Sequence, residues 1–176
     1  SPMSVSLVLT VIGDDRPGLV EQLATAVSLH HGNWLESSMS NLSGKFAGIV
    51  CVNVPEGQLA ALTDALASLP GLRITSEVSH SPVAQAGNRR LKLSLVGHDR
   101  IGIVREVSQV LARHALNVED LSTYTASAPM SAGMLFHASV ELTASSAFDV
   151  RALTSELEDL SNDLMVDITL DEAIRI

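Results

Sequence analysis

The chain has 176 residues, which is enough for one domain or two small ones. Hydrophobic residues make up 46% of it and charged residues 18%, so the chain can bury a core and is not a disordered tail. Its 11 basic and 20 acidic residues leave a net charge of −9, which disfavours direct binding to nucleic acid because a phosphate binder needs a basic face.

The cysteine count and the hydropathy pattern exclude further classes of protein. No apolar run approaches the roughly 18 residues that span a bilayer, so we expect no membrane segment. Cys51 is the single cysteine, which excludes an internal disulfide and a multi-thiolate zinc site within the chain. A single cysteine suits a reducing compartment, so we expect a cytoplasmic protein. No His spacing indicates a metal site, so we expect neither a metal nor a cofactor.

The first half of the chain predicts strands and helices in alternation. Residues 5–12 are a short apolar run rich in β-branched residues, typical of a strand. After a turn, Pro17 suits the first turn of a helix, because its missing N–H costs nothing there. One helical face then carries Leu19, Leu23, Ala26, Val27 and His30, and Gly32 ends the predicted helix.

Two strands, a second helix and a last strand complete this half. The strands 33–42 and 45–54 flank a Ser-Gly turn. Leucines at helical spacing predict a helix from about 59 to 69, followed by a strand over 72–78. The order βαββαβ is typical of an α+β, ferredoxin-like unit, an antiparallel sheet with both helices on one face. Residues 49–54 are apolar on both sides, so we expect the open face to be partly covered, by the other unit or by another chain.

The second half repeats the first. Five residues of the first turn and helix start recur 84 positions later, Gly13, Asp15, Arg16, Gly18 and Val20 as Gly97, Asp99, Arg100, Gly102 and Val104. The Ala-Gly pair at 47–48 matches the one at 132–133, an offset of 85, and segment 61–69 matches 152–160, an offset of 91. Growing offsets predict loop insertions in the second copy.

The repeat divides the chain into two homologous units. We predict a first domain over 3–79, a linker over 80–89 and a second domain over 90–172. The expected strands of the second unit are roughly 90–97, 117–126, 133–142 and 165–170. Its expected helices are roughly 101–114 and 149–161.

The repeated turn before the first helix of each unit is the candidate binding site. The first N–H groups of a helix have no internal partner and carry partial positive charge, so they can hold a carboxylate. A glycine at 18 would remove the side chain that blocks this approach, and Asp15 and Asn33 offer oxygens to an ammonium group. This combination suits a free amino acid. The alternative is that Gly18 only permits tight packing and Asp15 only caps the helix.

The motif resembles that of a known family. D-R-P-G-L-V after the first strand, then a helix and G-N-W, resembles the ACT domain, and D-R-I-G-I-V with L-N-V repeats it. Tandem units with D-R-x-G in both copies are similar to the glycine cleavage system transcriptional repressor family. The resemblance implies regulatory modules that bind amino acids where two units meet. The ligand contacts that it implies are Asp15, Arg16, Pro17, Gly18, Leu19, Asn33, Asp99, Arg100, Gly102, Ile103 and Asn117.

The resemblance also implies partners. The repressor family is thought to hold a LysR-type activator protein in check, with glycine as the signal, and not to read operator DNA alone. A glycine-like effector, a transcription activator as protein partner, a homo-oligomer and no catalytic activity are therefore expected. His98 and Ile101 stand where the first copy has Asp14 and Pro17, so the two sites differ in affinity or only one works. The alternatives are an amino-acid sensor for another protein or enzyme, and a nucleic-acid-binding module.

A few other residues have two interpretations each. His30 and His114 cap or pack the ends of matching helices, or contact a ligand. Cys51 is expected to be a buried structural thiol, and Trp34 is a core anchor or the floor of a pocket. The acids near the last helix form its water-facing side or a docking surface for a basic partner: Glu156, Glu158, Asp159 and Asp163.

Overall fold

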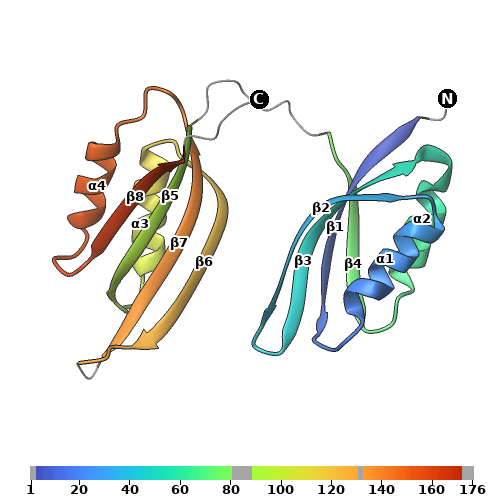
Figure 1. The fold of residues 1–176 in the computed structure, drawn as a ribbon, viewed down its shortest axis with the longest axis horizontal. Helices are drawn as coiled ribbons and strands as arrows, with labels where there is room; N and C mark the ends of the chain where they lie inside the picture. Colours follow the sequence, from blue (N-terminus) through green and yellow to red (C-terminus); the bar gives the residue numbers. More distant parts are fainter. Residues whose placement is uncertain (1–2, 81–88, 131–132, 172–176) are drawn as a thin grey trace. The chain divides into compact units, whose positions relative to one another are not determined.

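The computed structural model of the chain describes residues 3–80, 89–130 and 133–171. The chain divides into two compact units, residues 1–83 and 84–176 (Figure 1). The predicted linker, 80–89, falls largely on residues 81–88, outside the described residues, so the predicted limits of the linker and of both domains stay a prediction.

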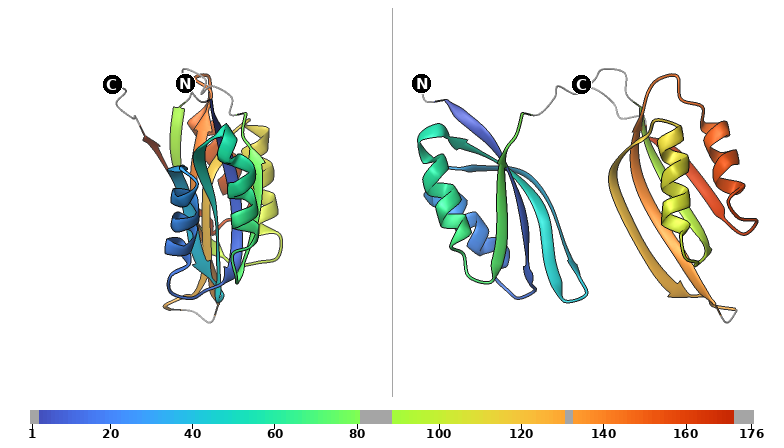
Figure 2. Two further views of the ribbon diagram at one scale, coloured as in Figure 1. Left: turned by 90° about the vertical axis from the view of Figure 1, so that its right-hand side faces the viewer. Right: turned by 180° about the vertical axis from the view of Figure 1, so that it is seen from behind.

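The first unit has the predicted βαββαβ order. Its elements are β1 (Ser4–Asp14), α1 (Leu19–Leu29), β2 (Asn33–Leu42), β3 (Lys45–Pro55), the 3₁₀ turn η1 (Glu56–Gln58), α2 (Leu59–Ala67) and β4 (Leu72–Val78). The strands form one antiparallel sheet in the order β2-β3-β1-β4. Both helices cover one face of the sheet (Figure 2), which confirms the predicted fold class.

The second unit repeats this topology. Its elements are β5 (Arg89–His98), α3 (Ile103–Arg113), β6 (Asn117–Ser127), β7 (Met134–Ala144), α4 (Val150–Glu158) and β8 (Met165–Asp171). The sheet order β6-β7-β5-β8 is the counterpart of the first, and every pair is antiparallel. Each helix is shorter than predicted, and α1 begins at Leu19, so Pro17 lies in the turn before the helix and not in its first turn.

Alternation along the strands separates a helix-covered face from an open face. In β1 and β3, every second residue is buried beneath the helices, which leaves the residues between them on the open face. The buried strand and helix residues of the first unit form a core of Leu7, Leu9, Val11, Leu19, Leu23, Ala26, Val27, Val50, Val52, Val54, Leu62, Leu66 and Leu72. The second unit has its own core of the same kind, in which Leu91, Leu93 and Leu95 replace the β1 residues.

The two open faces differ in character. In the first unit, Ile49 remains 56% exposed on this face and Cys51 is half-buried, so the expectation of a buried thiol is wrong. In the second unit, Lys92 and Glu141 occupy the open face as cross-strand neighbours. The duplication therefore kept the cores similar while the open faces diverged.

Strand register corrects one part of the predicted repeat. Gly48 pairs with Val11, and the counterpart of Val11, Leu95, pairs with Ala138. The counterpart of Gly48 is therefore Ala138, at an offset of 90, and not Gly133. The offset is still 84 in β6, so a six-residue insertion lies in the β6–β7 hairpin, where a longer loop was expected.

Candidate functional site

The β1–α1 turn presents an uncapped helix start. Gly18 is the N-cap of α1 with φ 91° and ψ 2°, and no side chain caps this end of the helix. A Cβ at Gly18 would meet nothing within 4 Å, so the alternative interpretation, that a glycine is needed here for tight packing, is wrong. The positive φ of residue 18 favours glycine instead. The first N–H groups of α1 therefore have no side-chain partner in the part of the chain that the structure describes.

The β5–α3 turn has the same geometry. Gly102 is the N-cap of α3 with φ 88° and ψ 1°, again without a side-chain cap. The Ile103 N–H lies 3.4 Å from the Arg100 carbonyl oxygen, a long hydrogen bond. In α4, by contrast, Asp149 accepts hydrogen bonds from the backbone N–H groups of Arg151 and Ala152 at 3.0 and 3.3 Å. The two motif helices thus lack the capping that α4 has.

The motif arginines brace these turns. Arg16 donates to Gln22 Oε1 at 2.9 Å and to the Pro70 carbonyl at 3.1 Å. Arg100 pairs with Glu106 and lies 3.4 Å from the Leu160 carbonyl oxygen. The hydrogen bond with Arg100 holds the pKa of Glu106 below its ordinary value. In each unit, the arginine therefore ties the turn to its own helix and to the segment before the last strand.

Asp15 does not cap α1. Its carboxylate accepts a hydrogen bond from Asn41, and its N–H donates to the Gly44 carbonyl at 3.0 Å. The neighbouring Asp14 pairs with Lys45, whose hydrogen bond and charge lower the pKa of Asp14. The β2–β3 hairpin thus holds the turn through three contacts, and the capping alternative for Asp15 is not observed.

The second unit braces the turn differently. Asp99 N–H donates to the Met134 carbonyl at 2.9 Å, which repeats the tie to the hairpin. Asp163 accepts from Ser161, from the His98 N–H at 2.9 Å and from the His98 ring. The hydrogen bond from Ser161, followed by those from His98, holds the pKa of Asp163 well below its ordinary range. Asp163 is therefore a brace and not only a water-facing acid.

Asn33 and Asn117 lie far from the turns of their own units. Asn33 pairs with Asn53, which also pairs with Ser6, eight residues before Asp14 on β1. Eight residues of strand span about 26 Å. In the second unit, Asn117 pairs with Thr143, the partner of Arg90, at the same distance along β5 from His98. Neither unit therefore brings its asparagine and its turn into one site.

The other predicted ligand contacts differ in how deeply they are buried. Leu19 and Ile103 belong to the cores, at 2% and 5% exposure, so their side chains cannot reach a ligand. Pro17 is exposed in the turn. The sequence interpretation missed Asn41, Lys45 and Gln22, which lie around the first turn. Pairing of the predicted strands would have placed the 41–45 hairpin beside residue 14.

Other predicted features have structural roles. The His30 Nδ1 lies 2.8 Å from the Ala26 carbonyl oxygen of its own helix, so it caps the end of α1, as expected. The His114 Nε2 lies 3.3 Å from Glu156 of α4 without a hydrogen bond, so this histidine packs against α4 at the end of α3. Trp34 packs against the core of the first unit. Within the described ranges, no group of three or more His, Cys, Asp or Glu residues is placed to hold a metal ion. No helix in the described part of the chain is long and apolar enough to cross a membrane.

Two βαββαβ units, each with a braced and uncapped turn, define a tandem module of the ferredoxin-like kind. The chain belongs to the ACT domain family, which matches residues 6–72 and 89–171. ACT domains are regulatory units that sense amino acids, and this chain carries two of them. No curated protein matches its sequence.

Two solved structures resemble the chain over nearly its full length. A protein of unknown function from Galdieria sulphuraria is 30% identical, with a TM-score of 0.84, over 98% of this chain and 100% of that one. A candidate glycine cleavage system transcriptional repressor is 18% identical, with a TM-score of 0.72, over 97% of this chain and 99% of that one. The second likeness concerns the fold alone.

Proposed function

We propose that this protein is a non-catalytic regulator that senses a small amino acid at its β1–α1 and β5–α3 turns. The observation that carries the proposal is the pair of uncapped helix starts at Gly18 and Gly102, each in the left-handed conformation. Unsatisfied N–H groups at a helix start favour an anion. The same device in both units supports a binding role.

The turn offers partners to both charges of an amino acid. In the first unit, the carboxylate would accept from the free N–H groups of the first turn of α1, beside Gly18. The ammonium group would donate to Asp15, which is exposed and anchored by Asn41. Asp99 and Gly102 take these roles in the second unit. Glycine suits such a turn because it has no side chain to place.

The finer proposal concerns the regulated system. We propose a cytoplasmic homo-oligomer that represses the glycine cleavage system by holding a LysR-type activator protein in check, with glycine as effector. The D-R-x-G turn in both units and the tandem fold shared with a candidate repressor support this proposal. Glycine can alter the affinity for the activator only if it binds the free and the partner-bound forms differently.

Thermal melting tests the sensing role. A ligand that binds the folded chain raises its stability by RT ln(1 + [L]/Kd), so glycine should raise the melting temperature progressively. The double variant Asp15→Ala/Asp99→Ala should lose the part of this response that the two turns contribute, whereas Asp64→Ala, an exposed acid on α2, should keep the full response. Flat melting curves with all twenty amino acids at millimolar concentration would refute the proposal.

A pull-down from the native host, with and without glycine, tests the finer proposal. We expect a LysR-type activator to be captured, in an amount that changes with glycine. Capture of a different protein in a glycine-dependent manner would leave the sensing role intact and refute the assignment to this system.

A further inference from the structure

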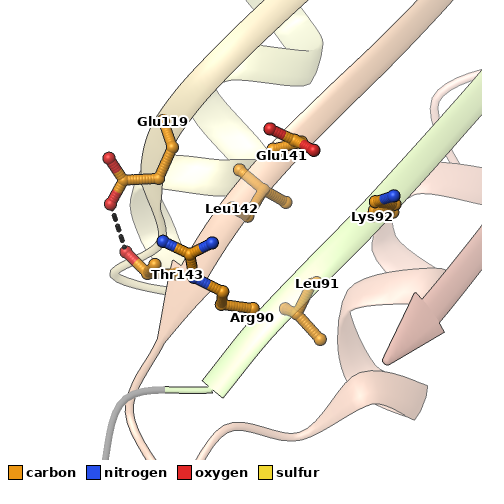
Figure 3. Close-up of a pocket in the computed structure, with 7 residues that line it drawn as sticks. All are labelled: Arg90, Leu91, Lys92, Glu119, Glu141, Leu142 and Thr143. Atoms are coloured by element: carbon orange, nitrogen blue, oxygen red, sulfur yellow. Dashed lines mark hydrogen bonds between the residues drawn. The ribbon is translucent and has the colours of Figure 1, made fainter. Parts of the chain in front are cut away.

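The open face of the second unit contains a small cavity away from the turns. Its volume is about 60 Å³, more than the ~10–15 Å³ that one water needs, so it can hold several waters or one small molecule. Three adjacent strands line it (Figure 3), through Arg90, Leu91, Lys92, Glu119, Glu141, Leu142 and Thr143.

The cavity combines two cations with two acids. Arg90 and Lys92 come from β5, where they pair with Thr143 and Glu141 of β7. Among the side chains that the structure describes, no ion pair joins these cations to Glu119 or Glu141. The Arg90 side chain extends toward Thr143 and Glu119 (Figure 3). Both signs of charge are therefore available to a ligand.

Glu119 is fixed in place by a strand irregularity. The β6 register shifts between Val118 and Asp120, a β-bulge that re-aims the residue within it. The Glu119 Oε1 accepts hydrogen bonds from Asn117 Nδ2 at 3.1 Å and from Thr143 Oγ1 at 3.0 Å. A carboxylate held by two donors has little conformational freedom left to lose when it binds a cation.

The first unit has the same backbone without these charges. By strand register, Ser6, Val8 and Cys51 are the counterparts of Arg90, Lys92 and Glu141. The first unit also has a register shift between Trp34 and Glu36, which places Leu35 where the second unit has Glu119. The four charges are thus specific to the second unit and are not required by the fold.

We infer that this cavity is a second binding site, for a small zwitterion that carries one carboxylate and one ammonium group. The carboxylate would pair with Arg90 and the ammonium group with Glu119, and Lys92 and Glu141 add one charge of each sign to the same cavity. A simple anion is repelled by the two acids and a simple cation by Arg90 and Lys92, whereas a dipolar molecule satisfies both. The site does not depend on the turn sites, since Arg90 lies about 26 Å along β5 from His98.

NMR of the ¹⁵N-labelled full chain tests the inference. Glycine should shift the amide signals of residues 90, 119 and 143 in a saturable manner. Acetate and methylammonium, which each carry one of the two charges, should shift them at least about tenfold less at equal concentration. Equal shifts with acetate would mean an anion site, and equal shifts with methylammonium a cation site. Either result, or no shift with glycine, overturns the proposal.

Substitutions separate this site from the turns. Arg90→Ala should weaken the glycine-dependent shifts of residues 119 and 143 about tenfold or more, because a charged hydrogen-bond partner is lost. The matched control is Ser6→Ala, its counterpart in the first unit, which should leave them unchanged. A second variant, Glu119→Leu, introduces the residue that the first unit has at this position and should also weaken the shifts. It keeps the proposal testable if the arginine variant does not fold. Full shifts in both cavity variants overturn the proposal, and the Asp15→Ala/Asp99→Ala variant, which tests the turns, should retain them.

Discussion

The left-handed conformation of Gly18 and Gly102 defines the turns at the scale of single residues. Both glycines have φ near +90°, a region that L side chains adopt only at a cost. The space at each Cβ position is free of close contacts, with Glu106 at 3.8 Å the nearest atom at Gly102. The cost of any substitution here is thus set by the backbone and not by packing.

Gly18→Ala should lower the free energy of unfolding by about 1 to 2 kcal/mol, because alanine resists a positive φ. Gly57 is the matched control, since its Cβ would also meet nothing within 4 Å but its φ lies outside the left-handed region. Gly57→Ala should change stability by no more than about 0.5 kcal/mol. Urea unfolding of both variants makes the comparison, and equal losses would contradict the backbone explanation.

At the scale of elements, each turn is fixed by neighbours that are distant in sequence. The β2–β3 hairpin holds the first turn through Asn41, Gly44 and Lys45. In the second unit, the hairpin keeps one backbone tie, and the α4–β8 segment supplies Asp163 instead. The two turns therefore have the same backbone conformation but different supporting contacts. We expect their stability to depend differently on pH.

The hydrogen bonds that Asp163 accepts predict that the second unit loses stability in acid. Its folded pKa is depressed from the ordinary 3.8, so its contribution to stability is complete above that value and is lost as pH falls toward the folded pKa. Asp163→Asn should therefore flatten the decline in melting temperature of the second unit below about pH 4. Asp159→Asn, an exposed acid of the same segment, should leave the decline as in the wild type. An unchanged decline in the Asp163 variant would show that the brace contributes nothing.

At the scale of the whole molecule, the two units are divergent copies. Each has its own core, and each turn has its own acid, Asp15 or Asp99. The net charge of −9 opposes binding of free anions, whereas a zwitterion brings no net charge. Because the contacts that hold the two turns have diverged since the duplication, we expect two turn sites with different affinities.

Calorimetric titration with glycine should resolve those sites. In the background of Arg90→Ala, which weakens glycine binding at the open-face cavity, Asp15→Ala should abolish one class of turn site and Asp99→Ala the other. The remaining dissociation constants should differ, because Asp14–Lys45 and His98–Asp163 support the two turns differently. If either substitution alone abolished all turn binding, the prediction of two independent sites would be wrong.

The element order, the duplication and the two turns can all be predicted from the amino-acid sequence. Strand alternation, helical spacing and the repeated D-R-x-G segments are local patterns. Each involves residues that are close in sequence, so it can be recognised without the fold. The same reasoning correctly predicted a loop insertion in the second unit. Of its two interpretations of Trp34, the structure shows the core anchor.

The residues that surround the turns depend on how the strands pair in the folded chain. Asn33 is near Asp15 in the motif but about 26 Å away along the sheet, because β2 starts at the opposite end from the turn. Asn41 and Asp163 reach the turns through strand pairing, and the cavity at Arg90 and Glu119 depends on a register shift in β6. Pairing and register are long-range properties, so the residues that share a site were fixed by the sheet and not by their spacing along the chain.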